Sequence, residues 1–569
     1  MFCKSCGKEL PDGAKFCGAC GTSTAGQAAP QTEAAPVAPM ETPVVETPVA
    51  ETPVAETPVQ ETAPKGDIKQ IVKERLLELV NIVKPYAQKF KLQLVGGAAL
   101  VVWLMAIAIV VALFTAGNGY IAAENGFTAS VLDDEVVVLW NNKVVNTDIE
   151  ADFLIKQSTN LDGTVFAGLT DNGILFVARK AKVAVVAEDV VYFNMSASGN
   201  GLAYVTEDGD DCELKLYSVK NKKSTMVDDE YSKYAATLFG MELSPDGKSL
   251  AYYELNEDGD ATLMYFSGKK SIKITSNEVD LIGLSNGGKF IYVLSENDDG
   301  ENVLNSYNTK GKRTKINTCS GTRFYFNDDH TQILFTNDGK TYISTKAKEA
   351  KKIVSGTARL LLTNDSNSFS GIFTSQATTY PVEDLYDHVY TVTSDGKTNL
   401  WHVKSAKKVI KLASNVYNYQ LDADAEYVYY TDKNDDLSVL KISHGEKAAD
   451  KAKELADDVD RYVVTSNRKT VYYLSDDALY SCNAKNGRAQ KEIASDDLGG
   501  GLVISAKNVV FYAYDGDLYA CSNGRTGKKV LSDPIDLYQC KNGVVYVMDE
   551  DSIYGTTGAA KLKKLLDND

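Results

Sequence analysis

Four cysteines near the N-terminus are the residues whose spacing most clearly predicts chemistry. Cys3 and Cys6 form one Cys-x-x-Cys pair, Cys17 and Cys20 form a second, and a glycine follows each pair. Each pair can offer two thiolates from one tight turn, and two such turns complete a tetrahedral Zn²⁺ site. Because four thiolates leave no open coordination position, we expect this zinc to be structural.

Residues 1–23 are too few to bury a stabilising core, so metal binding must supply the folding energy of this zinc ribbon. A redox-active Cys-x-x-Cys pair is the alternative, but it needs a surrounding βαβ domain that the sequence lacks. With Phe16 before the third cysteine, the segment resembles the zinc ribbons that begin many bacterial membrane proteins. The resemblance implies a membrane protein that begins with a small metal-binding domain.

An uncharged apolar run from Leu94 to Phe114 predicts one transmembrane helix, because such a run spans a hydrocarbon core of about 30 Å. Basic residues precede it from Lys65 to Lys91, whereas the first basic residue after it is Lys143. Since Lys and Arg stay on the cytoplasmic side, we expect a cytoplasmic N-terminus and an extracytoplasmic C-terminal domain in a single-pass protein of the cell membrane.

Two segments connect the predicted ribbon to the predicted span. Residues 24–65 contain near-perfect Glu-Thr-Pro-Val repeats, and regularly spaced proline predicts an extended, disordered linker. Residues 66–91 predict an amphipathic juxtamembrane helix that Pro85 ends or kinks. This helix could lie on the inner leaflet or pair with a second copy.

From residue 127 to residue 569 the sequence reads as repeated short β segments, which predicts an all-β domain. The clearest copy runs from Leu243 to Asn277 and alternates strands with a Pro-Asp-Gly turn, an acidic turn and a Gly-Lys-Lys turn. First turns recur near residues 162, 199, 246, 287, 329, 365, 423, 467, 507 and 542. Spacings of about 40 residues are typical of four-stranded β-propeller blades.

The string from Ser244 to Tyr252 resembles the TolB-like propeller repeat of bacterial envelope proteins. That resemblance implies a propeller and little about function. About ten copies, or eleven with the hairpin that begins at Val136, leave three arrangements open: one large ring, a ring with incomplete copies, or two rings in series. Residues from Phe127 onward are a candidate for closing a ring by pairing with a strand near the C-terminus.

Within the repeats the sequence favours binding over catalysis. The four histidines, His330, His388, His402 and His444, share no spacing, and there is no Gly-x-Ser-x-Gly motif. Acidic turns such as Asp258-Gly-Asp could hold Ca²⁺, but Asp and Gly are also what hairpin turns require, and we favour that interpretation. Cys482 and Cys521 occupy equivalent repeat positions, which indicates strand packing.

The net charge of −17 falls mostly after residue 116, which argues against nucleic-acid binding by the repeats. We therefore expect a non-enzymatic envelope protein whose propeller binds a ligand or protein outside and whose zinc ribbon binds a protein inside, as a sensor or scaffold. The alternatives are a propeller-based hydrolase or lyase, and a membrane-tethered regulator whose ribbon contacts nucleic acid.

Overall fold

Short β-rich runs joined by tight turns form every sheet in the computed structural model of this chain. The structure describes residues 122–567, with gaps at 125–126, 133, 181, 209–210, 257–258, 363–376, 497, 540–542, 550–551 and 559. These residues belong to the second of two units into which the chain divides, Gly96–Asp569. The predicted zinc ribbon, linker, juxtamembrane helix and membrane span all lie outside the described residues. Within the described ranges, no helix has the length and apolar character needed to cross a membrane.

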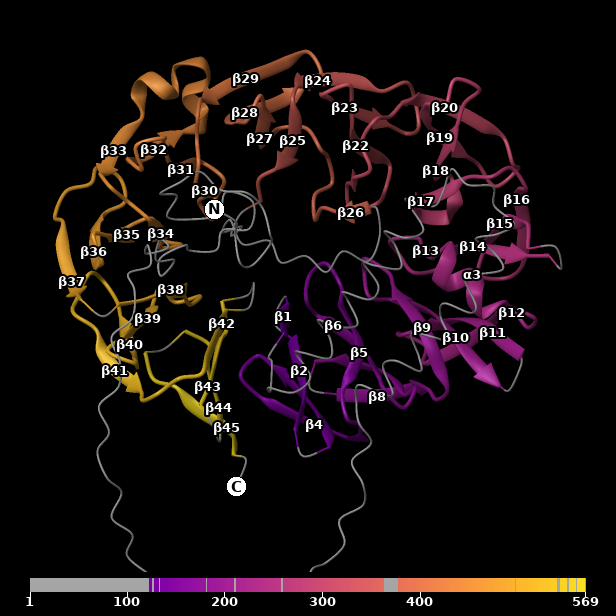
Figure 1. The fold of residues 1–569 in the computed structure, drawn as a ribbon, viewed down its shortest axis with the longest axis horizontal. Coiled ribbons are helices and arrows are strands. Elements are labelled where there is room, and N and C mark those ends of the chain that lie inside the picture. Colours follow the sequence, from indigo (N-terminus) through magenta and orange to yellow (C-terminus); the bar gives the residue numbers. More distant parts are fainter. Residues whose placement is uncertain are drawn as a thin grey trace, which may run out of the picture. The chain divides into compact units, whose positions relative to one another are not determined.

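Eleven sheets follow one another around a single ring and form the blades of a β-propeller (Figure 1). All strand pairs in them are antiparallel except that of β21 (Phe324–Phe326) with β26 (Ala377–Thr379). In ten of them four strands pair in the order in which they occur along the chain, with the first strand innermost, and blade 6 carries a fifth strand. The ten sequence copies correspond to blades 2 to 11, and the hairpin from Val136 belongs to an additional first blade. Of the arrangements that the sequence left open, the structure therefore has the single large ring.

The first six blades have the following strands. Blade 1 contains β1 (Ala122–Glu124), β2 (Phe127–Leu132), β3 (Glu135–Trp140) and β4 (Val144–Glu150), and blade 2 contains β5 (Leu154–Thr159), β6 (Val165–Thr170), β7 (Leu175–Arg179) and β8 (Lys182–Ala187). Blade 3 contains β9 (Val190–Met195), β10 (Gly201–Asp208), β11 (Asp211–Ser218) and β12 (Lys223–Asp228), and blade 4 contains β13 (Met241–Leu243), β14 (Leu250–Leu255), β15 (Ala261–Phe266) and β16 (Ser271–Thr275). Blade 5 contains β17 (Asp280–Leu284), β18 (Ile291–Glu296), β19 (Asn302–Tyr307) and β20 (Arg313–Thr318), and blade 6 contains β21 (Phe324–Phe326), β22 (Gln332–Asn337), β23 (Lys340–Thr345), β24 (Lys351–Ser355) and the added β26 (Ala377–Thr379).

The remaining five blades complete the ring. Blade 7 contains β25 (Thr357–Leu360), β27 (His388–Ser394), β28 (Lys397–Ser405) and β29 (Lys408–Ala413), and blade 8 contains β30 (Tyr419–Leu421), β31 (Tyr427–Thr431), β32 (Leu437–Lys441) and β33 (Lys453–Ala456). Blade 9 contains β34 (Arg461–Val464), β35 (Thr470–Ser475), β36 (Ala478–Asn483) and β37 (Lys491–Ser495), and blade 10 contains β38 (Leu498–Ile504), β39 (Val510–Tyr514), β40 (Asp517–Cys521) and β41 (Lys528–Leu531). Blade 11 contains β42 (Asp536–Gln539), β43 (Val545–Met548), β44 (Ser552–Thr556) and β45 (Lys563–Asp567). The described helices are short: α3 (Lys233–Leu238), η1 (Asn286–Gly288), η2 (Ile442–Lys447) and η3 (Ala449–Lys451).

Buried tyrosines of the second strands occupy the interfaces between neighbouring blades. Each lies in an apolar cluster shared by two adjacent sheets, where a large aromatic ring contributes much of the buried area. The hydroxyl of Tyr429 donates to the carbonyl of Ala484 in the next blade at 3.1 Å, and the hydroxyl of Tyr472 accepts from Gly524 N at 2.9 Å. The fully buried members are Tyr252, Tyr292, Tyr390, Tyr429, Tyr472, Tyr512 and Tyr546.

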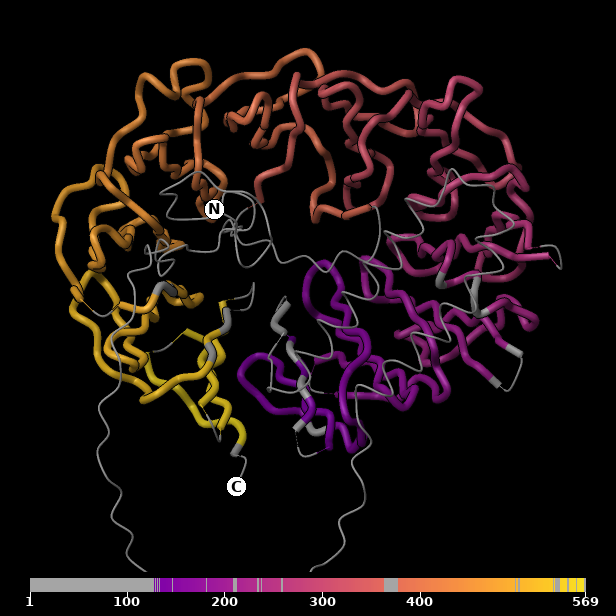
Figure 2. The backbone as a smooth tube through the Cα atoms, in the orientation of Figure 1, coloured from indigo at the N-terminus to yellow at the C-terminus, as the bar shows by residue number. Residues whose placement is uncertain are grey.

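The ring closes through the same kind of interface. Val137 and Leu139 of blade 1 pack with Tyr546 and Ile553 of blade 11, and Asn142 N donates to the Tyr546 hydroxyl at 3.2 Å. The expected pairing of a strand near Phe127 with a C-terminal strand is wrong, because β2 pairs with β1 and β3. All four strands of blade 1 come from one end of the chain and all four of blade 11 from the other (Figure 2). Side-chain packing, rather than a shared sheet, therefore joins the two ends of the ring.

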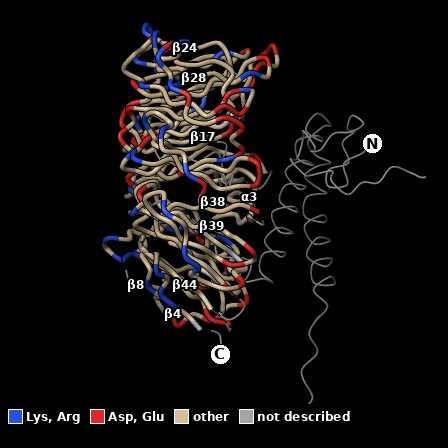
Figure 3. Tube along the Cα trace, turned by 90° about the vertical axis from the view of Figure 1, so that its left-hand side faces the viewer, with Lys and Arg blue, Asp and Glu red and all other residues tan. Residues whose placement is uncertain are grey.

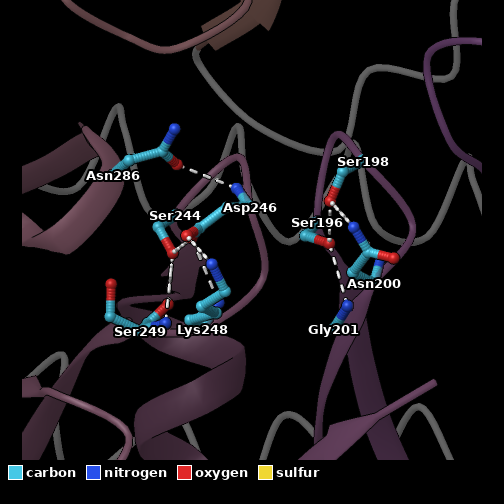
Figure 4. A network of polar contacts seen from close by, with 9 residues as sticks. All are labelled: Ser196, Ser198, Asn200, Gly201, Ser244, Asp246, Lys248, Ser249 and Asn286. Carbon is cyan, nitrogen blue, oxygen red and sulfur yellow. Dashed lines mark hydrogen bonds and ion pairs between the residues drawn. The ribbon is translucent and has the colours of Figure 1, made fainter. Parts of the chain in front are cut away.

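The turns between first and second strands link the blades a second time (Figure 4). In blade 4 the fully buried Ser244 accepts from Ser249 N at 3.1 Å and donates to Asp246 at 2.8 Å. Asp246 N in turn donates to Asn286 Oδ1 of blade 5 at 2.9 Å. Buried polar residues hold the same position in seven other blades: Asn160, Ser196, Ser285, Asn327, Asp422, Thr465 and Ser505.

We predict that Gly201→Ala destabilises the ring, because the added Cβ would lie 2.3 Å from Gly247 O and 2.7 Å from Gly247 Cα of the next blade. Overpacking against backbone costs about 1–3 kcal/mol, so the urea midpoint of the full chain should fall. Gly321→Ala is the matched control, because its Cβ would come no closer than 3.2 Å to Thr336 O. Equal midpoints for the two variants would contradict this account of the turn contacts.

Candidate functional site

A polar cluster on the inner strands of three consecutive blades is the part of the described structure that best fits a binding or catalytic site. Lys156 comes from β5 of blade 2, Tyr192 and Asn194 from β9 of blade 3, and Glu242 from β13 of blade 4. First strands are innermost, so these residues lie on the inner side of the ring (Figure 1). Each keeps part of its surface exposed.

Lys156 is held by backbone, amide and aromatic groups of the next blade. Its Nζ donates to Phe193 O at 2.6 Å and to Asn194 Oδ1 at 2.8 Å. The ammonium also lies 4.5 Å from the centre of the Tyr192 ring, within the range of a cation–π interaction. Asn194 Nδ2 donates to Met241 O at 2.7 Å, so one chain of hydrogen bonds runs from blade 2 through blade 3 to blade 4.

The protein surroundings shift the pKa values of Glu242 and Lys156 toward neutral pH. Desolvation raises the pKa of Glu242 to about 7, and the positive charge of Lys156 opposes that shift. Desolvation lowers the pKa of Lys156 to about 8, and the Glu242 charge opposes it in turn. The pKa of Tyr192 is raised to about 12 by desolvation and by the Glu242 charge. A carboxyl and an amine that both titrate near neutrality can exchange protons with a bound ligand.

Sequence reasoning missed this cluster because each blade supplies only part of it. In each of their strands the residues are isolated polar side chains, and sequence gives no measure of distance across blades. The available signal was weak: Lys156 and Glu242 are charged residues in innermost strands, where an alternating pattern predicts one protein-facing side and one open side.

A second charged cluster joins blades 8 and 9 and has a structural role. Arg468 Nη1 lies 3.0 Å from the buried carboxylate of Asp422 and 2.9 Å from Glu426, and Nη2 lies 3.1 Å from Asp424. The guanidinium also packs over the Tyr427 ring at 5.2 Å. Because Asp422 also caps its own turn by accepting from Tyr427 N at 2.8 Å, Arg468 neutralises a carboxylate that the fold keeps buried.

The histidines lie apart and serve local contacts. His330 is buried, and its two ring nitrogens lie 3.0 Å from Leu284 O and 2.7 Å from Thr379 Oγ1; desolvation lowers its pKa to about 4. His402 pairs with Asp387 at 2.9 Å, His388 contacts Asp384 O, and His444 lies in η2. The structure brings none of the four into the inner-strand cluster.

Cys482 and Cys521 are buried at equivalent points of β36 and β40, which confirms the packing interpretation. Desolvation raises the pKa of each thiol to about 12, so both stay protonated at neutral pH. Cys540 lies outside the described residues.

The acidic turns all fall on one side of the ring because of strand topology. Successive strands of a blade run in opposite directions, so the first-to-second and third-to-fourth turns lie on one face of the ring. The second-to-third hairpins and the links between blades lie on the other face, here called the acidic face. All eleven of these hairpins carry a carboxylate in or beside the turn. Within the described ranges no three His, Cys, Asp or Glu side chains come close enough to hold a metal ion. One such residue per blade is Asp134, Asp171, Asp208, Asp260, Asp298, Asp338, Asp395, Asp432, Asp476, Asp515 and Asp549.

The other face of the ring, here called the basic face, carries the first-to-second and third-to-fourth turns. Every third-to-fourth turn contains an exposed Lys or Arg. In Figure 3 red segments are frequent on the side that carries α3, which lies in a link between blades, and blue segments are frequent on the opposite side, where red ones also occur. One exposed basic residue per blade is Lys143, Lys180, Lys222, Lys269, Lys310, Lys348, Lys407, Lys451, Lys485, Arg525 and Lys561.

Comparison with known proteins identifies the N-terminal segment. Residues 2–24 match the zinc-ribbon domain family, and this range contains all four predicted ligands, Cys3, Cys6, Cys17 and Cys20, which lie outside the described residues. The chain thus carries a zinc-ribbon domain and an eleven-bladed β-propeller, a combination that indicates protein interaction. The donor set of four thiolates fits a structural zinc ion.

Similarity over the longer part of the chain gives no information on function. No curated protein sequence matches the chain. A crystal structure of the eukaryotic initiation factor is similar at 11% identity and a TM-score of 0.38, covering 65% of this chain and 97% of that chain. A crystal structure of the tricorn protease is similar at 14% identity and a TM-score of 0.24, covering 70% of this chain and 48% of that chain. At these TM-scores neither similarity supports a functional assignment.

We predict that Glu242→Gln raises the unfolding temperature at pH 8 but changes it little at pH 4.5. The folded state keeps a proton on Glu242 up to about pH 7, whereas the unfolded chain releases it near the usual value of 4.5. Wild-type stability therefore falls as pH rises through this window, and the variant lacks that loss. Glu254→Gln, at an exposed position of blade 4, is the control. A difference between variant and wild type that does not grow with pH would contradict the shifted pKa.

We also predict one zinc ion per chain, bound through Cys3, Cys6, Cys17 and Cys20. Cys17→Ser should lower the zinc content measured by atomic emission after dialysis against a weak chelator, because three thiolates bind more weakly than four. Cys482→Ser, which removes a buried propeller thiol, should leave the zinc content unchanged. Retention of zinc by the Cys17 variant would show that other residues bind the metal.

Proposed function

We propose that this chain is a non-enzymatic, membrane-anchored envelope protein that binds a ligand or protein partner through its propeller outside the cell. Its zinc ribbon binds a protein inside the cell, so the chain acts as a sensor or scaffold across the membrane. The apolar run from Leu94 to Phe114 and the basic residues before it support the anchor and its direction.

The observation that carries this proposal is the place where the chain enters the ring. β1 begins at Ala122 at the end of blade 1 that belongs to the acidic face, because its other end leads directly into the first turn. A membrane span that ends at Phe114, here called the tether, therefore leads into the propeller on the acidic face. The basic face, with its first-to-second and third-to-fourth turns, is turned away from the tether. Turns displayed on a rigid scaffold are where binding usually resides.

An envelope hydrolase or lyase is the second candidate, and the inner-strand cluster is the observation that favours it. Lys156, Tyr192 and Glu242 have shifted pKa values, as groups in active sites often do. The hydrogen bonds of Lys156 to Phe193 O and Asn194 also give it a structural role between blades, and this is the role we favour.

Protease treatment of intact cells tests the orientation. We expect protease to cleave the region after residue 117 and to leave the zinc ribbon protected, with both regions cleaved once the cells are opened. Crosslinking of the full chain in cells, followed by separate recovery through the ribbon and through the propeller, should yield different partners. Complete protection in intact cells, or cleavage of the ribbon there, would contradict the proposed orientation.

A further inference from the structure

The basic face carries a repeated charge pattern that turn chemistry does not explain. Asp and Gly in the hairpins of the acidic face are residues that tight turns prefer, so their presence needs no ligand. Lysine has no such preference, yet all eleven third-to-fourth turns present it or arginine. We define each third-to-fourth turn as the described residues between the end of the third strand and the start of the fourth. The acidic residues in these turns are Glu349, Glu446 and Asp450.

The distance between the two faces keeps the carboxylates of the second-to-third hairpins from cancelling the positive charge of the third-to-fourth turns. A strand of six residues such as β15 is about 20 Å long at about 3.3 Å per residue. The Debye length at physiological ionic strength is about 8 Å, so the faces are separated by more than two screening lengths. The first-to-second turns also lie on the basic face, nearer the centre of the ring, and several carry carboxylates, such as Asp162, Asp246 and Asp424. An anion that follows the outer third-to-fourth turns therefore has the lysines of those turns as its nearest charges, although the net charge of the chain is −17.

The geometry of the turns indicates the shape of the ligand. Third and fourth strands are the outer strands of each blade, so their turns follow the outer part of the ring (Figure 1). Basic groups thus recur along a curved path, once or more per blade. A flexible chain with regularly spaced negative charges can follow such a path and make many weak contacts, which add through effective concentration.

We propose that the basic face binds a flexible linear polyanion that runs along the third-to-fourth turns of successive blades. This inference deepens the proposed binding role and rests on it, because the position of the tether turns the basic face away from the bilayer. The tether position is also why we favour a polymer over an anionic lipid surface. Lysine, as a mobile point charge, suits phosphate or carboxylate polymers without demanding one geometry.

Binding of fluorescent inorganic polyphosphate and of poly-glutamate to the purified full chain tests the inference. We expect anisotropy to show binding to one or both polymers at about 50 mM salt, with log affinity falling linearly against log salt concentration. The triple variant Lys312→Glu, Lys348→Glu and Lys407→Glu changes exposed residues of blades 5, 6 and 7 on the basic face. Its affinity should fall on the order of tenfold, and the salt slope should drop by about 0.7 for each contact removed.

The matched control makes the same charge change on the acidic face. Lys340→Glu, Lys397→Glu and Lys433→Glu alter exposed lysines in or beside second-to-third hairpins and should change the affinity less than about twofold, because they lie more than two screening lengths away. Equal losses in the two triple variants would overturn the inference, as would wild-type protein that binds neither polymer. Preference for vesicles of anionic lipid over both polymers would also overturn it. If the polymers fail to bind while crosslinking still recovers a propeller partner, the proposed function stands and only this ligand class falls.

Discussion

Contact between adjacent blades is the interaction on which the rest of this structure depends. A four-stranded sheet of short strands buries little area by itself, so each blade needs a neighbour on both sides. The second-strand tyrosines fill these interfaces, and their hydroxyls find partners in the same or the next blade, as Tyr292 does with the carbonyl of His330. Since the closing contact of Tyr546 with Asn142 repeats the pattern of Tyr472 with Gly524, closure needs no exchanged strand.

The repeated interface also explains where this protein places polar groups. Buried Ser, Asn, Thr and Asp residues cap the first turns, and backbone groups cross between blades there, as Ser198 N does to Pro245 O at 3.0 Å. These bonds satisfy buried amides that would otherwise cost free energy. They also leave little room for larger residues, which is why Gly201 and Gly247 face each other.

Strand topology turns a local sequence pattern into a property of the whole ring. Each blade has an acidic second hairpin and a basic third turn, and a four-stranded antiparallel sheet places these on opposite faces. Eleven repetitions around one ring give one face a carboxylate at every second hairpin and the opposite face a basic residue at every third turn. The sum of formal charges, by contrast, describes neither face and says little about which ligands this domain attracts.

The sequence by itself determined the parts of this protein that depend on neighbours along the chain. The zinc ribbon follows from four cysteines within one short segment, a prediction that the domain match supports. The strands around Leu250, Leu263 and Ile272 follow from alternation and turn residues, and the repeat spacing located ten of the eleven blades. Local turn chemistry and β-propensity carry this information, so no distant contact was needed to read it.

Tertiary structure alone decided how many blades share one ring, how the ring closes and which residues meet inside it. Blade number depends on the angle between packed sheets, which side-chain packing at each interface sets. β26 lies along the chain between the first two strands of blade 7 but pairs with β21 of blade 6, a contact between segments that share no sequence signal. Lys156, Asn194 and Glu242 likewise lie together only because three inner strands are neighbours in the ring. The pKa values of Lys156 and Glu242 shift because the folded ring, not the chain, removes the two charged groups from water.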